Sequence, residues 1–217
     1  LLRSADASQE AWDLLFRPRT AYILGRSVLL VATVTAVSLA LALPLAWLTL
    51  RTDLPFRRAW SVLSVLPLVI PSYVGAFLVI SALGPKGLVQ HMLSGPFGVD
   101  RLPDIDGLPG ATITLSLLSY PYILLTVRGV LNNLDPALEE SARGMGLGAL
   151  STLTRVTLPQ LRPAITAGAL LVALYTLSDF GAVSLMDYET FTWAIYQQFS
   201  AFDRSIAAVL SLVLVAL

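Results

Sequence analysis

One carboxylate lies inside an otherwise uncharged stretch of the chain: Asp179, within residues 163–186. A charged side chain at the centre of a bilayer costs about 2.5–3.5 kcal/mol on insertion scales, and it usually faces the interior of a helix bundle or a cavity. Asp179 therefore has two compatible interpretations. It can cap a short helix that follows Phe180-Gly181, or it can attract a cation on a translocation pathway.

Three tyrosines close to prolines are further candidates for such a pathway. Tyr73 follows Pro71 at a short distance, and Tyr120 and Tyr122 flank Pro121. Hard metal ions prefer oxygen ligands, and the phenol group supplies one. Tyrosines in membrane proteins also anchor at the interface or pack with a bonded hydroxyl, so both interpretations stay open. No metal site is established by these residues.

Other chemistry is excluded by composition. Cysteine is absent, which excludes disulfides and thiolate metal sites, and histidine occurs once, at His91, which argues against a histidine-based metal cluster or a Ser-His-Asp triad. Glu139 and Glu140 have no nucleophile or metal partner nearby in the sequence, and we expect Glu139 to be merely an exposed neighbour of Glu140. No cofactor is predicted. The net charge is zero and basic residues do not cluster, which argues against nucleic acid as a partner.

The elements that position these residues are predicted to be membrane helices. Of 217 residues, 56% are hydrophobic and 13% are charged, whereas soluble domains carry about 25% charged residues. Runs of nearly uncharged residues predict spans at about 22–50, 59–83, 108–130 and 163–186, with an incomplete fifth at 204–217. The expected fold class is therefore an all-α polytopic membrane protein, a single domain over 1–217 embedded in the lipid bilayer. We also expect it to be trimmed at both ends.

The arginines predict the orientation of the bundle. The loop after the first span holds Arg51, Arg57 and Arg58, and residues 128–162 hold four more arginines. By the positive-inside rule these two loops face the cytoplasm and the other two face outward. Positive residues near the start of the chain do not fit this scheme, and they leave the side of the N-terminus open.

The loop 131–162 carries the strongest local signals. Asp135 followed by Pro136 predicts the start of a helix that runs to about Arg143. A run of glycines then predicts a turn, and a second short helix is expected over 149–158, ending at Pro159 before Pro163 opens the fourth span. On composition alone, a docking surface and a solvated loop are equally good interpretations.

The spacing within this loop resembles the EAA loop of ABC importer permeases. That pattern is Glu-Ala-Ala, three residues, Gly, nine residues, then Ile-x-Leu-Pro; here Ser141 replaces the first alanine and Val156 the isoleucine. The resemblance implies a type I (MetI-like) permease bundle in which 131–162 is a coupling loop that docks into cytoplasmic ABC ATPase subunits. The residues it implicates are Glu140, Ser141, Ala142, Arg143, Gly146, Val156, Leu158 and Pro159.

Further segments are similar to those of ferric-iron permeases: Ile70-Pro71-Ser72-Tyr73-Val74-Gly75-Ala76-Phe77, Ser119-Tyr120-Pro121-Tyr122, Ser178-Asp179-Phe180-Gly181-Ala182-Val183-Ser184 and Phe191-Thr192-Trp193-Ala194-Ile195-Tyr196. This likeness implies ferric iron as substrate, a periplasmic binding protein that delivers it, a second permease half (fused or dimeric) and a bacterial inner membrane. Thiamine, polyamines or another small solute are alternatives, and a gated ion channel is the rival class. No phosphate-binding glycine loop with lysine is present. ATP hydrolysis is therefore expected in a separate subunit, and the chain itself is not expected to be an enzyme.

Overall fold

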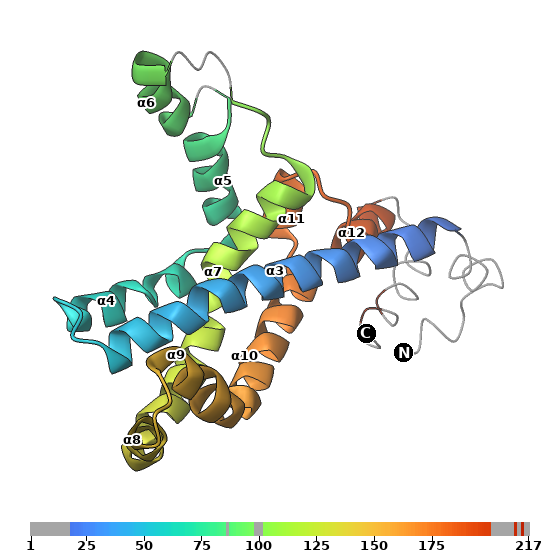
Figure 1. Cartoon of the computed structure of the whole chain (residues 1–217). Helices are drawn as coiled ribbons and strands as arrows, with labels where there is room; N and C mark the ends of the chain where they lie inside the picture. Colours follow the sequence, from blue (N-terminus) through green and yellow to red (C-terminus); the bar gives the residue numbers. More distant parts are fainter. Residues whose placement is uncertain (1–17, 86, 98–101, 201–210, 212–213, 215–217) are drawn as a thin grey trace.

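The computed structural model describes residues 18–85, 87–97, 102–200, 211 and 214, and every regular element in this part of the chain is helical. Figure 1 shows their arrangement. In chain order the elements are α3 (Pro18–Arg51), α4 (Arg57–Leu63), the 3-10 turn η2 (Leu66–Val69), α5 (Ser72–Leu83), α6 (Leu88–Phe97), α7 (Gly107–Asn133), α8 (Pro136–Gly144), α9 (Ala149–Thr152), the π-helical turn η3 (Leu153–Thr157), α10 (Leu158–Ser178), α11 (Gly181–Leu185) and α12 (Phe191–Ser200).

Four helical stretches are long and apolar enough to cross a membrane: Pro18–Arg51, Ser72–Ser94, Gly107–Asn133 and Leu153–Ser178. A helix satisfies its own backbone hydrogen bonds, which is the requirement for a segment surrounded by lipid. The predicted all-α membrane bundle is therefore confirmed. The expected fifth span, 204–217, lies almost wholly outside the described residues.

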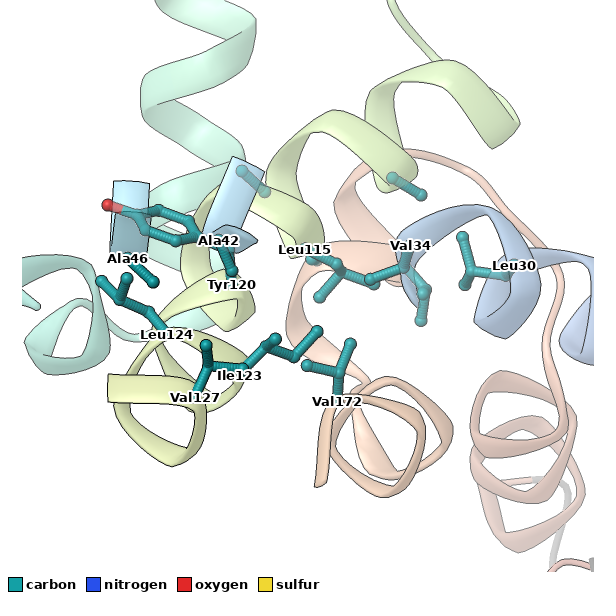
Figure 2. Close-up of a cluster of buried hydrophobic side chains, with 14 of the residues drawn as sticks. Leu30, Val34, Ala42, Ala46, Leu115, Tyr120, Ile123, Leu124, Val127 and Val172 are labelled. Atoms are coloured by element: carbon teal, nitrogen blue, oxygen red, sulfur yellow. The ribbon is translucent and has the colours of Figure 1, made fainter. Parts of the chain in front are cut away.

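The core of the bundle forms where α3 and α10 pack against α7 (Figures 1 and 2). The buried residues of α3 recur every four positions, at Leu30, Val34, Ser38, Ala42 and Ala46. This spacing keeps them on one face of the helix. Small residues in the stripe let the two backbones approach closely, as is common between membrane helices.

Polar contacts and a glycine tighten these helix pairs. The hydroxyl groups of Ser38 on α3 and Ser119 on α7 are 3.3 Å apart. Between α10 and α7, a Cβ added to Gly168 of α10 would lie 2.7 Å from the Cα of Ile123. Gly168 is therefore the residue that permits the close contact between α10 and α7.

The second predicted span, 59–83, differs from expectation because it is not one helix. It is divided into α4, η2 and α5, with Pro67 inside the 3-10 turn and Pro71 at the N-cap of α5. Each proline lacks the N–H that would continue an α-helical hydrogen-bond ladder. The apolar stretch of spanning length instead begins at Ser72. Pro121, by contrast, lies inside the uninterrupted α7.

The expected end of a helix at Pro159 is also corrected by the structure. Helix α9, turn η3 and α10 follow one another without a gap, and the N–H of Leu158 bonds five residues back, to Leu153. In an α-helix the ring of Pro159 would clash with the carbonyl of residue 155. The wider π turn gives that ring room. The side chain of Gln160 donates to the carbonyl of Val156 at 3.0 Å.

Candidate functional site

The loops at 52–56 and 134–157 lie at the same end of the bundle, because Arg51 contacts both Leu131 and Glu139. At the other end, the N–H of Gly107 donates to the carbonyl of Met186 at 2.6 Å. The two arginine-rich loops that the sequence assigns to the cytoplasm therefore share one end. Helix α8 projects there, at the lower left of Figure 1.

Helix α8 begins as the sequence predicts. The side chain of Asp135 accepts a hydrogen bond from the N–H of Ala137 at 2.9 Å, and Pro136 occupies the first turn, where its missing N–H costs nothing. The acidic residue in the first turn and Arg143 in the last turn both complement the helix dipole. These local features fix where α8 starts.

The end of α8 is a Schellman turn centred on Gly146. The N–H of Leu147 bonds to the carbonyl of Ala142 at 3.1 Å, and the N–H of Gly146 bonds to that of Arg143 at 2.9 Å. Gly146 has a φ of 88°, in the left-handed region that glycine adopts without steric cost. Of the three glycines in this run, only Gly146 has a positive φ.

The residues of the EAA pattern in α8 divide between two faces. Glu140, Ser141 and Arg143 are exposed, and Met145 just beyond them is 79% exposed. Ala142 points inward and is buried. Farther along the pattern, Gly146 is exposed, while Val156, Leu158 and Pro159 are partly covered. The outward face of α8 is therefore free to meet another protein.

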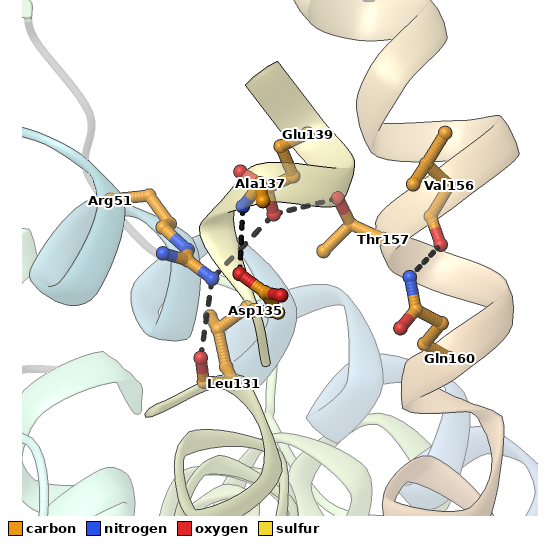
Figure 3. Close-up of polar contacts among 8 residues, drawn as sticks. All are labelled: Arg51, Leu131, Asp135, Ala137, Glu139, Val156, Thr157 and Gln160. Carbon is orange, nitrogen blue, oxygen red and sulfur yellow. Dashed lines mark hydrogen bonds and ion pairs between the residues drawn. The ribbon is translucent and has the colours of Figure 1, made fainter. Parts of the chain in front are cut away.

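The sequence interpretation of Glu139 is wrong. This residue was expected to be exposed, but its side chain is only 12% exposed and makes two contacts inside the protein (Figure 3). It also lines a small cavity of about 210 Å³ together with Arg51, Glu140 and Arg143. Sequence spacing offered one signal: Glu139 and Ala142 are three residues apart and so share a helix face.

Asp179 caps a helix, as one of its two interpretations predicts. It ends α10, is 8% exposed, and its Oδ1 accepts from the N–H of Ala182 at 2.9 Å and of Val183 at 3.4 Å. Its own carbonyl accepts from the hydroxyl of Thr192 at 2.8 Å. The break between α10 and α11 is thus stabilised by one side chain.

The candidate pathway tyrosines do not gather in one place. Tyr122 packs against Tyr175 with ring centroids 5.7 Å apart, and Ser72 lies within hydrogen-bonding reach of both Tyr175 and Asp179. Tyr120 is two residues from Tyr122 on a continuous helix and so points to a different side of α7.

Tyr73 is 59% exposed, although it follows Ser72 directly. The sequence interpretation missed Tyr175 and Ser72. The four-residue spacing from Tyr175 to Asp179 could have indicated the first of them. No group of three or more His, Cys, Asp or Glu side chains that could hold a metal ion occurs within the described part of the chain.

Comparison with known proteins assigns the family. Residues 37–217 match the model for the binding-protein-dependent transport system inner membrane component. The chain belongs to this family of membrane transport components.

Three curated relatives show how the chain compares with individual members. It is 35% identical to the Fe(3+)-transport system permease protein FbpB 2 of Haemophilus influenzae, over 94% of this chain and 37% of that protein. It is 30% identical to a probable molybdenum ABC transporter permease of Haloferax volcanii, over 75% of this chain and 57% of that protein. It is 26% identical to the sulfate transport system permease protein CysT of Salmonella typhimurium, over 94% of this chain and 75% of that protein. The chain thus spans less than two thirds of the length of the first two relatives.

A solved structure of a bacterial alginate ABC transporter, in complex with an alginate-bound periplasmic protein, shares the fold. Its TM-score is 0.69 with 20% identity, over 94% of this chain and 76% of the other. The predicted fold of an ABC importer permease is therefore confirmed.

Proposed function

We propose that this chain forms the transmembrane permease part of an ATP-driven importer, with α8 as the helix that docks into a cytoplasmic ABC ATPase. The observation that carries this proposal is the outward face of α8, which holds Glu140, Ser141 and Arg143 exposed between an Asp135 cap and a Gly146 turn. Family membership supports it. The chain itself is not an enzyme in this scheme, and ATP is hydrolysed by the partner.

The other partners follow from the same scheme. A second permease half, fused or dimeric, completes the translocation pathway across the lipid bilayer, and a periplasmic binding protein delivers the solute. Closure of the ATPase dimer moves α8, and the spans switch between inward and outward access. The bacterial inner membrane is the proposed location, as the family description indicates.

We propose ferric iron as the substrate. The relative that is 35% identical is named for iron, whereas others are named for molybdenum and sulfate. The network of the buried Asp179 with the partly buried Ser72, Tyr175 and Tyr122 also supports a cation, because its oxygen atoms suit a hard metal ion. A buried carboxylate would repel molybdate or sulfate. Tyr73 and Tyr120 lie outside this network and are weaker pathway candidates.

The test is reconstitution in proteoliposomes of the full-length protein that contains this chain, its ATPase and its binding protein. We expect radiolabelled ferric iron to be taken up only with ATP, and the iron-loaded binding protein to stimulate ATP hydrolysis. Molybdate, sulfate, thiamine and spermidine serve as competing solutes. Uptake of one of these solutes in place of iron would refute iron as the substrate but would leave the proposed importer function standing. Flux without ATP, and no association with an ATPase, would favour a gated channel.

A further inference from the structure

The carboxylate of Glu139 joins α8 to the transmembrane helices. Its Oε1 accepts a hydrogen bond from the hydroxyl of Thr157 at 2.9 Å and lies 3.6 Å from the Nη2 of Arg51 (Figure 3). One oxygen atom therefore contacts both the end of α3 and the start of α10. Glu140, the next residue, points out of the protein.

Arg51 extends this connection to a third helix. Its Nη2 also donates to the carbonyl of Leu131, in the last turn of α7, at 3.3 Å. The last carbonyls of a helix have no partner within the helix, and a cation there is favoured by the helix dipole. Arg51, at the end of α3, therefore binds the end of α7 and also contacts Glu139 on α8.

Thr157 connects Glu139 directly to α10. It is completely buried and is the last residue of the π turn η3, which leads straight into α10. A buried hydroxyl without a partner is costly, and the Oε1 of Glu139 is its acceptor here. π turns are rare in proteins, but many of those that occur lie at functional sites. The turn η3 therefore fits a position at which movement of α8 is transmitted to α10.

We infer that Glu139 is the positioning residue that transmits displacement of α8 to α3, α7 and α10, while Glu140 and Arg143 serve contact with the ATPase. This inference rests on the proposed importer function. When the ATPase displaces the docked α8, the spans follow only if the contacts between α8 and the spans stay intact. The charge-assisted contacts at Glu139 are the side-chain contacts that meet this need, since they are partly shielded from water and join three spans.

The experiment uses the reconstituted full-length complex and measures solute uptake per ATP hydrolysed. Glu139→Gln removes the charge at nearly constant size, and Thr157→Val removes the hydroxyl. We expect each to lower uptake per ATP by about tenfold, the effect of losing a charge-assisted hydrogen bond, with ATPase binding unchanged. The double variant Glu139→Gln/Thr157→Val should couple more poorly than either single variant, because the first change removes the ion pair with Arg51 and the second removes the hydrogen bond from Thr157.

Glu140→Gln is the matched control, one position along the same helix. It should weaken association with the ATPase, whereas Glu139→Gln should leave that association at the wild-type level. The inference is overturned if Glu139→Gln keeps normal uptake per ATP, or if it loses ATPase binding as Glu140→Gln does. A different result tests the importer itself: a wild-type complex that binds no ATPase would refute the proposed function rather than the role of Glu139.

Discussion

Arg128 on α7 donates from its Nη2 to the hydroxyl of Thr49 on α3 at 2.8 Å. The same guanidinium reaches Ser64 Oγ at 3.3 Å and the carbonyl of Ser61 at 3.1 Å, both in or beside α4. Arg128 is only 8% exposed, and each of these three acceptors is neutral. It therefore joins the short α4 to the two helices that form the core, with hydrogen bonds in place of an ion pair.

Replacing Arg128 by methionine should destabilise the protein strongly. The change leaves the hydroxyls of Thr49 and Ser64 without this donor and takes one of two donors from the carbonyl of Ser61. We expect the free energy of unfolding to fall by about 2–4 kcal/mol. Thermal unfolding of the purified protein in detergent measures the loss. Arg143→Met, at an exposed position of α8, is the control and should unfold at the wild-type temperature. Equal melting of both variants would show that the Arg128 contacts add nothing.

Gly146 allows backbone geometry and surface shape to be tested separately. Gly146→Ala forces a side chain into a left-handed conformation at a cost of about 1–2 kcal/mol, whereas Gly148→Ala, at a position without positive φ, should be neutral. Gly146→Trp adds bulk where, apart from its own backbone and its two chain neighbours, none of the described residues has an atom within 4 Å of the new Cβ. We expect Gly146→Trp to insert normally yet abolish transport, measured as solute uptake. Normal transport by this variant would contradict a coupling role for the loop.

The contact between α7 and α10 should tolerate no side chain at Gly168. A Cβ there would lie 2.5 Å from the hydroxyl of Thr126 and 2.7 Å from the Cα of Ile123, so the helices must separate. We expect Gly168→Ala to lower the free energy of unfolding by about 1–3 kcal/mol, as overpacking does. Gly129→Ala, where the new Cβ meets open space, should raise it by up to about 1 kcal/mol through helix propensity. Chemical or thermal unfolding of the two variants side by side measures both changes in the free energy of unfolding.

Two substitutions at Asp179 separate its cap from a role in the pathway. Asp179→Ala removes the acceptor for Ala182 and Val183 and should cost about 1 kcal/mol of stability. Asp179→Asn keeps an acceptor oxygen but loses the charge. We therefore expect near-normal melting with reduced uptake of ferric iron, measured at saturating ATP. Wild-type uptake by Asp179→Asn would leave Asp179 as a helix cap alone.

Sequence reasoning succeeded where the cause is local. Asp135, Pro136 and Gly146 fix both ends of α8 through contacts within a few residues, so the pattern predicted the helix and its turn correctly. It failed at Pro159, because a proline that normally ends a helix is accommodated here by the π turn before it. The second span is broken at Pro67 and Pro71, where the missing N–H groups interrupt the α-helical hydrogen bonds.

The sequence by itself determined the helical membrane class and the exposed motif on α8. Hydropathy and capping act over short distances, and each is complete within its own segment. Only the tertiary structure decided which way a polar side chain turns. Glu139 faces Arg51, 88 positions earlier, and Arg128 faces Thr49, 79 positions earlier, because residues far apart in the chain meet where helices pack. Such partners depend on packing between helices, which the periodicity of a single helix does not encode.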